Sequence, residues 1–279
     1  MSIELKNISY RYENDGDDAS SRLILDGINL TIKKEELTAI MGATGSGKST
    51  LIQHLNLLLH AQSGEIFYEG EDIYAEDFNR KALRANVGLV FQYPEYQLFE
   101  TDVFTDVCFG PKNLCLTQGE IEDRARKALA LVGLSEEDWH RSPFELSGGQ
   151  KRRAAIAGVL AMQPKYLILD EPAAGLDPKG RRDMLELMRA LQREAGIGVV
   201  FVSHSMDDVA QYADRIVVLD GGKIRFEGTA KEVFRHRDEL ESIGLSVPQA
   251  AKVAALLQSK GVKLPEDIIT RDELVKALS

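Results

Sequence analysis

Apolar residues recur along the chain with two different periods. Segments 3–12 and 23–32 alternate apolar and polar positions, as half-exposed strands do. Later apolar runs are short and continuous, which is typical of buried strands, and helical patterns separate them. These runs are 37–41, 87–91, 166–170, 198–202 and 215–219. The alternation predicts an α/β fold with a mostly parallel, buried sheet whose functional groups lie at the carboxyl ends of its strands.

Helical spacing of apolar residues fills most of the remaining chain. It predicts helices over 48–59, after Gly149 and over 178–194. A long helical stretch, 101–141, predicts a helical insert between strands of the sheet, whose extent we place at about 93–160. The run 215–219 is expected to form a hairpin with 223–226 through the turn 220–222.

Polar and terminal segments add two further expectations. The polar segment 13–21 predicts a hairpin loop or an insertion between the first two strands. The tail 231–279 carries amphipathic patches at 248–258 and 271–278, which predict a small helical appendix.

Composition excludes several classes of protein. A net charge of −10 disfavours nucleic-acid binding, which needs a basic surface. Two cysteines, Cys108 and Cys115, are too few for a disulfide scaffold and are expected to be buried or half-buried thiols in a reducing compartment. The first residues lack a signal segment, and no apolar run approaches the roughly 20 residues that span a bilayer. We therefore expect a cytosolic chain that reaches a membrane only through a partner.

A glycine-rich loop, GATGSGKS at 42–49, follows one predicted strand and precedes a helix. This is the context in which such a loop binds phosphate. Glycines let backbone N–H groups approach the anion, while Lys48 reaches the β- and γ-phosphates and Ser49 offers a hydroxyl to Mg²⁺. The residues expected to bind the nucleotide here are Gly42, Thr44, Gly45, Ser46, Gly47, Lys48, Ser49 and Thr50.

Polar residues follow three of the predicted strands. Asp170, at the end of 166–170, can hold Mg²⁺, while the next residue, Glu171, faces elsewhere and can act on a water molecule. Gln92 follows 87–91 and can touch both Mg²⁺ and that water. His204 follows 198–202, which should lie beside the strand of Asp170, so its imidazole is expected near the γ-phosphate. These residues predict hydrolysis of a nucleotide with Glu171 as the base.

A second phosphate-binding segment, Ser147-Gly148-Gly149-Gln150, starts a helix far along the chain. Its hydroxyl and open backbone N–H groups suit an anion. The helical insert carries this segment away from the sheet, so we expect it to close over the ATP of a second chain rather than its own.

Three features leave alternatives open. The basic run 151–153 is either a solvated helix face or a phosphate contact. The aromatic residues after Gln92 form either local core or a surface groove that grips a partner helix. They are Tyr93, Tyr96, Phe99, Phe104 and Phe109. The other four histidines, which we expect to be solvated or to cap helices, are His54, His60, His140 and His236.

Over about residues 2–230 the chain resembles ATP-binding cassette (ABC) ATPases, because all their motifs stand in order. The loop at 42–49 resembles the Walker A motif, 167–170 the Walker B motif, Gln92 the Q-loop, and 146–150 the signature. The segment 174–177, with Asp177, resembles the D-loop. Glu171 falls at the catalytic glutamate, His204 at the switch histidine, and Tyr12 at the aromatic residue that stacks on adenine, with Tyr10 a weaker candidate.

The resemblance implies a P-loop ABC ATPase fold with an antiparallel β subdomain and a helical subdomain. It also implies a cassette over 1–230, followed by an appendix over 231–279 that joins two ATPase subunits. One departure is Ala173, where the pattern often has Thr or Ser.

The segments 91–99, 109–111 and 142–145 are similar to the ATPases of energy-coupling-factor transporters, and the chain looks most like the second of their two ATPase types. This implies an ATP- and Mg²⁺-dependent peripheral subunit on the cytoplasmic face of the membrane. It would pair with a related ATPase, bind a membrane scaffold (T component) and a substrate-capture protein (S component), and power uptake of a vitamin or transition metal ion. The alternative is a soluble ABC ATPase with no role in transport.

Overall fold

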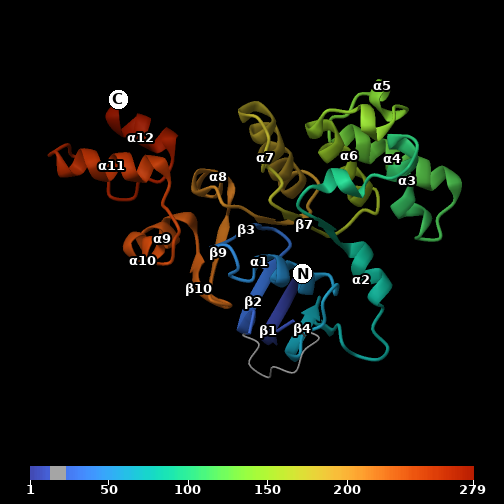
Figure 1. The fold of residues 1–279 in the computed structure, drawn as a ribbon, viewed down its shortest axis with the longest axis horizontal. Helices are drawn as coiled ribbons and strands as arrows, with labels where there is room; N and C mark the ends of the chain where they lie inside the picture. Colours follow the sequence, from blue (N-terminus) through green and yellow to red (C-terminus); the bar gives the residue numbers. More distant parts are fainter. Residues whose placement is uncertain (13–22) are drawn as a thin grey trace.

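Two sheets of different construction organise the computed structural model, which describes residues 1–12 and 23–279 (Figure 1). The polar loop expected at 13–21 lies outside the described residues. The larger sheet has the strand order β10-β9-β3-β8-β7-β6 and is parallel from β9 to β6, with β10 antiparallel at its edge. Its strands are β3 (Leu37–Gly42), β6 (Val87–Val90), β7 (Tyr166–Asp170), β8 (Gly198–Val202), β9 (Arg215–Asp220) and β10 (Lys223–Gly228). The predicted mostly parallel α/β fold is confirmed.

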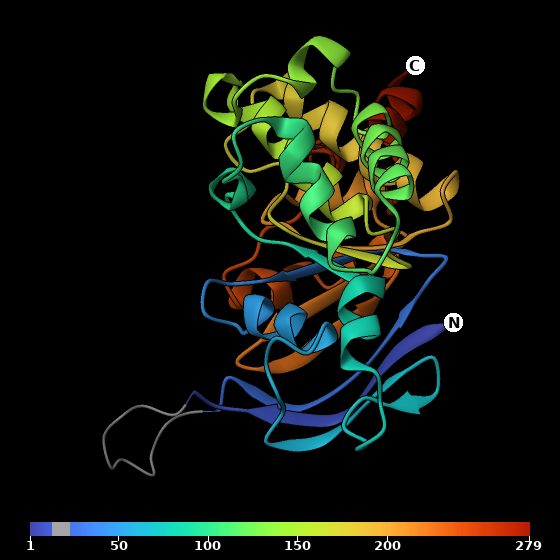
Figure 2. The ribbon, with the colours of Figure 1, turned by 90° about the vertical axis from the view of Figure 1, so that its right-hand side faces the viewer.

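The smaller sheet is antiparallel, with the order β2-β1-β4-β5. It consists of β1 (Ser2–Tyr10), β2 (Leu25–Lys33), β4 (Ser63–Tyr68) and β5 (Glu71–Asp72). Alternating exposure along β2 matches the alternating sequence pattern from which it was predicted. Figure 2 shows this sheet on one side of the larger sheet and a group of helices on the other.

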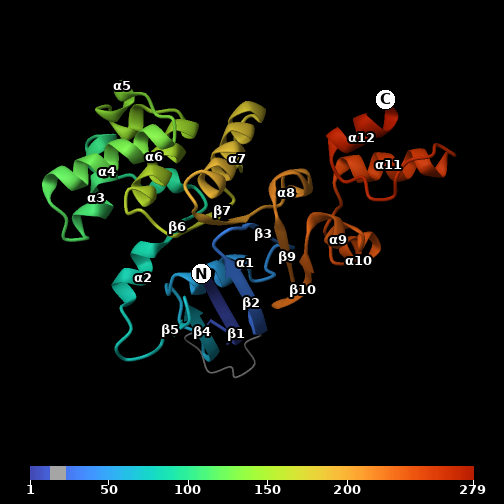
Figure 3. The ribbon, with the colours of Figure 1, turned by 180° about the vertical axis from the view of Figure 1, so that it is seen from behind.

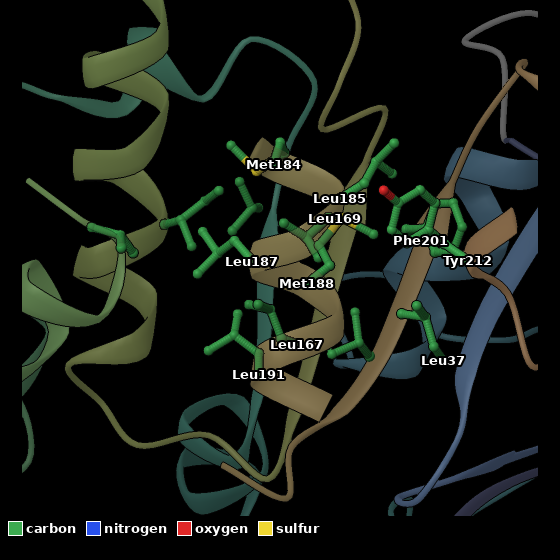
Figure 4. Packing of buried hydrophobic residues seen from close by; sticks show 14 of the residues in the cluster. Leu37, Leu167, Leu169, Met184, Leu185, Leu187, Met188, Leu191, Phe201 and Tyr212 are labelled. Atoms are coloured by element: carbon green, nitrogen blue, oxygen red, sulfur yellow. The ribbon is translucent and has the colours of Figure 1, made fainter. Parts of the chain in front are cut away.

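Burial on both faces explains why the strands of the larger sheet read as continuous apolar runs. Along β7, Leu167 and Leu169 face one hydrophobic cluster, whereas Tyr166 and Ile168 face the other. The first cluster includes the apolar face of helix α7 (Pro178–Arg193), which packs over β7 and β8 (Figure 4). Each fully buried leucine contributes about 1.5–3 kcal/mol to stability. The second cluster lies between the two sheets around helix α1 (Lys48–Leu55).

The helical insert lies on the side of β6, the edge strand of the larger sheet (Figure 3). It contains α3 (Val103–Lys112), α4 (Gln118–Leu131), α5 (Glu136–Trp139) and α6 (Gly148–Leu160). Both α4 and α6 begin with a capping box, made by Thr117 with Glu120 and by Ser147 with Gln150. These caps fix where the helices start.

The tail forms helices on the opposite side of the molecule from the insert (Figure 3). They are α9 (Ala230–Phe234), α10 (Arg237–Ser242), α11 (Gln249–Ser259) and α12 (Arg271–Leu278). Phe234 and Leu240 belong to the first large cluster, whereas Ala250, Ala254 and Ile268 form a small cluster of their own. The predicted appendix therefore contains a part packed on the cassette and a part with its own core. In the described residues, no helix has the length and apolarity needed to cross a membrane.

The structure differs from the predicted elements in three places. Helix α1 ends at Leu55 instead of residue 59, because Leu57 adopts a left-handed conformation with φ 59°. The segment with β4, β5 and α2 (Arg80–Asn86) was not predicted. Neither was α8 (Met206–Tyr212), a short helix after β8.

Candidate active site

The glycine-rich loop connects β3 to α1 and surrounds the amine of Lys48. Lys48 Nζ donates hydrogen bonds to the carbonyls of Gly42 (2.8 Å) and Ala43 (2.9 Å). Burial lowers the pKa of Lys48, and the carboxylates of Glu171 and Asp170 partly offset that effect. Gly47 has φ 104°, and a Cβ there would lie 2.7 Å from the carbonyl oxygen of Ile24, so only glycine fits. A buried cation at a helix N-terminus favours an anion.

A hydroxyl and a carboxylate meet beside this loop. Ser49 Oγ, in the first turn of α1, donates to Asp170 Oδ2 at the end of β7 (3.0 Å). Burial raises the pKa of Asp170, while the hydrogen bond from Ser49 opposes the shift. Oxygen donors of this kind suit Mg²⁺, which commonly takes few protein ligands and completes its octahedron with phosphate oxygens and water. The described residues contain no cluster of three or more His, Cys, Asp or Glu that could hold a metal alone. The hydroxyl of Ser49 and the carboxylate of Asp170 fit a Mg²⁺ that is shared with a bound nucleotide.

Glu171 lies between two polar partners from neighbouring strands. Gln92 Nε2 donates to Glu171 Oε2 (3.0 Å), and His204 Nε2 lies 2.9 Å from Glu171 Oε1. The three residues converge because β6, β7 and β8 are adjacent and parallel and end at the same edge. Glu171 has φ 49°, a left-handed conformation that costs a non-glycine residue about 1–3 kcal/mol. The contacts with Gln92 and His204 hold the carboxylate in one orientation.

A cavity of about 310 Å³ opens beside this carboxylate. Its walls come from the turn after β7 and the residues after β8, including Glu171, Ala174, His204 and Asp208. Water and reacting groups can therefore reach both Glu171 and His204.

Tyr12 contacts the first turn of α1, just after the glycine-rich loop. Its hydroxyl is 3.2 Å from Thr50 Oγ1 in α1, and its ring contacts Tyr10 edge-on with centroids 5.1 Å apart. Tyr12 is 45% exposed and can offer its ring to a planar ligand. Of the other loop residues, Thr44 and Gly45 are exposed, whereas Ser46 is buried.

The segment 147–150 sits in the helical insert, which Figures 1 and 3 show apart from α1. Ser147 Oγ accepts from the backbone N–H of Gln150 (3.4 Å) and donates to Gln150 Oε1 (2.8 Å). A Cβ at Gly148 or Gly149 would meet nothing within 4 Å. Packing inside this chain therefore does not require these glycines. Asp177 caps α7 by accepting from Gly180 N (3.1 Å).

Two predictions about polar residues were wrong. Arg152 is neither solvated nor free to contact phosphate: it is 4% exposed and donates to the carbonyls of Pro172 (2.9 Å) and Ala174 (2.7 Å). His54 neither is solvated nor caps a helix end: it is fully buried, and its Nδ1 lies 2.7 Å from the carbonyl oxygen of Thr50 within α1. Its position between Leu51 and Leu55 on the buried side of α1 was the available signal.

The predictions for the cysteines and the aromatic residues hold for some of these residues and not for others. Cys108 is buried as expected, but Cys115 is exposed. Four of the five aromatic residues favour the surface alternative and form what we call the aromatic patch: Tyr93, Tyr96, Phe99 and Phe109. Their exposed fractions run from 46% for Phe109 to 85% for Tyr96, whereas Phe104 packs against the core.

Comparison with known proteins gives consistent results. Residues 25–174 match the ABC transporter family. The energy-coupling factor transporter ATP-binding protein EcfA2 of Caldanaerobacter subterraneus subsp. tengcongensis is 50% identical over 98% of this chain and 95% of its own. The protein of the same name from Symbiobacterium thermophilum is 52% identical over 91% of this chain and 88% of its own.

Solved structures agree with the sequence matches. CbiO1 from Clostridium perfringens, described as part of the ABC transporter complex CbiONQ, is 38% identical. It has a TM-score of 0.77 and covers 92% of this chain and 98% of its own. The ATP-binding cassette MJ0796, solved as a dimer in a post-hydrolysis state with ADP and Pi, is 28% identical, with a TM-score of 0.70 over 82% of this chain and 98% of its own.

Proposed function

The chain belongs to the ABC transporter family, and from this premise we propose that it is the ATP-hydrolysing subunit of an energy-coupling-factor importer. The observation that carries the proposal is the contact of Glu171 with both Gln92 and His204, next to Lys48 and Asp170. A carboxylate held beside a phosphate-binding loop suits hydrolysis of a phosphoanhydride, and binding alone does not require it.

Each residue at the sheet edge then has a role. Lys48 and the loop N–H groups hold the β- and γ-phosphates, and Tyr12 stacks on adenine. Ser49, Asp170 and Gln92 hold Mg²⁺, which when bound neutralises charge on the phosphates. Glu171 accepts the proton of the attacking water. His204 stabilises the charge that develops on the γ-phosphate during in-line attack.

A second ATPase subunit completes this site. Ser147 and the N–H groups of Gly148 and Gly149 serve the ATP of that facing subunit, and the facing subunit's signature serves the ATP of this chain. Open space around both glycines supports this arrangement. Asp177 and Gln150 lie at the same interface. A related subunit is the preferred partner over an identical copy, and the appendix 231–279 helps to hold the pair together.

The transport partners lie in the membrane. The aromatic patch follows Gln92 directly. When the Gln92 loop moves, a scaffold-protein helix bound to the patch would therefore be displaced with it. That scaffold and a substrate-capture protein would carry a vitamin or a transition metal ion, with this chain at the cytoplasmic face.

The test is Ser147→Ala, measured in two settings. In the isolated chain, we expect unchanged ATP affinity, because the hydroxyl serves the other subunit's nucleotide. In the pair co-purified from membranes, we expect hydrolysis to fall by about tenfold or more. Thr117→Ala is the matched control, since it removes the same kind of capping box from α4. Full-speed hydrolysis by a strictly monomeric preparation of the Ser147→Ala variant would refute the proposal.

A further inference from the structure

Arg152 connects three segments of the chain that the catalytic groups depend on. It lies on α6, five residues after Ser147, and is 4% exposed. One of its terminal nitrogens donates to the carbonyls of Pro172 (2.9 Å) and Ala174 (2.7 Å), in the turn that begins with Glu171. The other lies 3.7 Å from Glu95 Oε2, in the short helix (Pro94–Gln97) that follows Gln92.

Both segments that Arg152 contacts lie next to a residue with a left-handed backbone conformation. Glu171, directly before Pro172, has φ 49°, and Tyr93, directly before that short helix, has φ 59°. Such conformations persist only where the surroundings hold them. The planar guanidinium offers donors in a fixed fork, so one side chain can hold both segments at a set separation.

The contact with Glu95 is incomplete in this structure. Within the described part of the chain, Arg152 Nε and Glu95 Oε2 are buried atoms without a hydrogen-bond partner. A buried charge with unfilled hydrogen-bonding capacity is costly, and a shift of the Gln92 loop toward α6 would relieve that cost. The Arg152–Glu95 contact therefore leaves hydrogen-bonding capacity unused on both side chains.

We propose that Arg152 is a positioning residue for hydrolysis: it fixes the Glu171 turn and the Gln92 loop relative to each other from the helix that carries the signature. This rests on the proposed function, in which Glu171 is the base and Ser147 faces a second subunit. Because α6 starts at the facing subunit's ATP and Arg152 touches this chain's own Glu171 turn, the same helix connects the two ATP sites.

The experiment replaces Arg152 by Met and compares ATP turnover by the co-purified pair with ATP affinity of the isolated chain. A misplacement of about 1 Å in a catalytic group costs roughly 100-fold in rate. We expect kcat of Arg152→Met to fall about 10- to 100-fold, with ATP affinity within threefold of the unsubstituted chain. Arg152→Lys should recover part of the loss, because it keeps the charge without the fork.

Arg153→Met is the matched control. Arg153 is the next residue of α6 and partly buried, but it contacts Val132 within the insert and Asp183 in α7. We expect its kcat within threefold of the unsubstituted pair. Equal losses from Arg152→Met and Arg153→Met would overturn the proposal and indicate a general packing role.

A second substitution distinguishes positioning of Glu171 from other effects. In a Glu171→Gln background, Arg152→Met should cause no further loss, because the group it positions is already inactive. A further loss of the same factor would contradict the proposal. If Arg152→Met does not fold, Glu95→Gln and Arg152→Lys decide, and unchanged kcat in both would overturn it. Failure of the proposed function itself would look different, because Glu171→Gln would then not slow turnover.

Discussion

Replacing Glu171 by Gln tests the reaction assigned to this chain with little change of shape. The amide keeps the volume of the carboxylate, and its oxygen can still accept from Gln92 Nε2, now at 3.0 Å from Glu171 Oε2. Its N–H can donate to His204 Nε2, which lies 2.9 Å from Glu171 Oε1, when the imidazole carries its proton on Nδ1. The strained turn and the phosphate loop are therefore expected to keep their places, so ATP binding should persist.

The substitution removes one property, the ability to accept a proton from water. A positioned general base contributes about 10²- to 10⁴-fold in rate, which corresponds to about 2.7–5.5 kcal/mol in the activation free energy. Since both contacts of the side chain survive, this loss should fall on kcat and leave KM for ATP nearly unchanged.

Phosphate release by the purified pair measures the rate, and size-exclusion chromatography with ATP measures pairing. We expect Glu171→Gln to accumulate as an ATP-bound pair with little turnover. Glu76→Gln, at an exposed position outside the site, is the control. Turnover within about tenfold of the unsubstituted pair would refute the assignment of Glu171 as the base.

Three further predictions concern stability and contacts. Burial raises the pKa of Asp170 above its value in the unfolded chain. The ionised carboxylate therefore destabilises the fold at neutral pH, and this effect disappears as the pH falls below the unfolded pKa, where the group is protonated in both states. Asp170→Asn should therefore unfold at a higher temperature than the unsubstituted chain at pH 7, and the difference should shrink towards pH 4; a constant difference would contradict this. Tyr96→Ala should leave hydrolysis by the ATPase pair unchanged and weaken binding to the membrane scaffold, whereas Leu58→Ala, an exposed control, should not; equal binding by both variants would argue against the aromatic patch. Removing 249–279 should change the thermal midpoint of the cassette little, because only Ile269 of its buried residues belongs to the first large cluster and the others form a small core of their own. The removal should also weaken pairing, which chromatography would detect; intact pairing would contradict a role for the tail.

The sequence predicted the central sheet well because its strands are buried on both faces. Continuous apolar runs such as 166–170 and 198–202 have few alternatives at that length. The segment 63–86 was harder. Strand β4 has three exposed residues before its first buried one, and β5 is only two residues long, so neither shows a clear period. The place of β4 in the sheet depends on pairing with β1, and that of β5 on pairing with β4, and the local sequence encodes neither pairing.

The candidate site likewise has a part that the sequence predicts and a part that it does not. Residues that follow strands in a parallel sheet converge by topology, so the sequence alone places Gln92, Glu171 and His204 together. The position of Arg152 is not predictable in this way, because its burial depends on carbonyls about 20 residues away and on Glu95 from another segment. Among three basic residues in a row, nothing local marks the one that faces inward. The assigned roles of these residues remain predictions.

At Gly148 and Gly149, an added methyl group would meet nothing within 4 Å apart from the adjoining residues and the backbone of its own helix. An alanine there is not expected to weaken the helix, since alanine is the better helix former, by up to about 1 kcal/mol in a helix interior. Such a variant is expected to express, to keep its thermal stability and to bind ATP like the unsubstituted chain. Measurements on the single subunit would therefore show no defect. Under the proposed pairing, its defect would emerge only after assembly, where the variant subunit would also inactivate the ATP site of the unsubstituted subunit that it joins. If each subunit supplies half of its partner's reaction centre in this way, such variants would be dominant, and cellular removal of misfolded protein would not eliminate them.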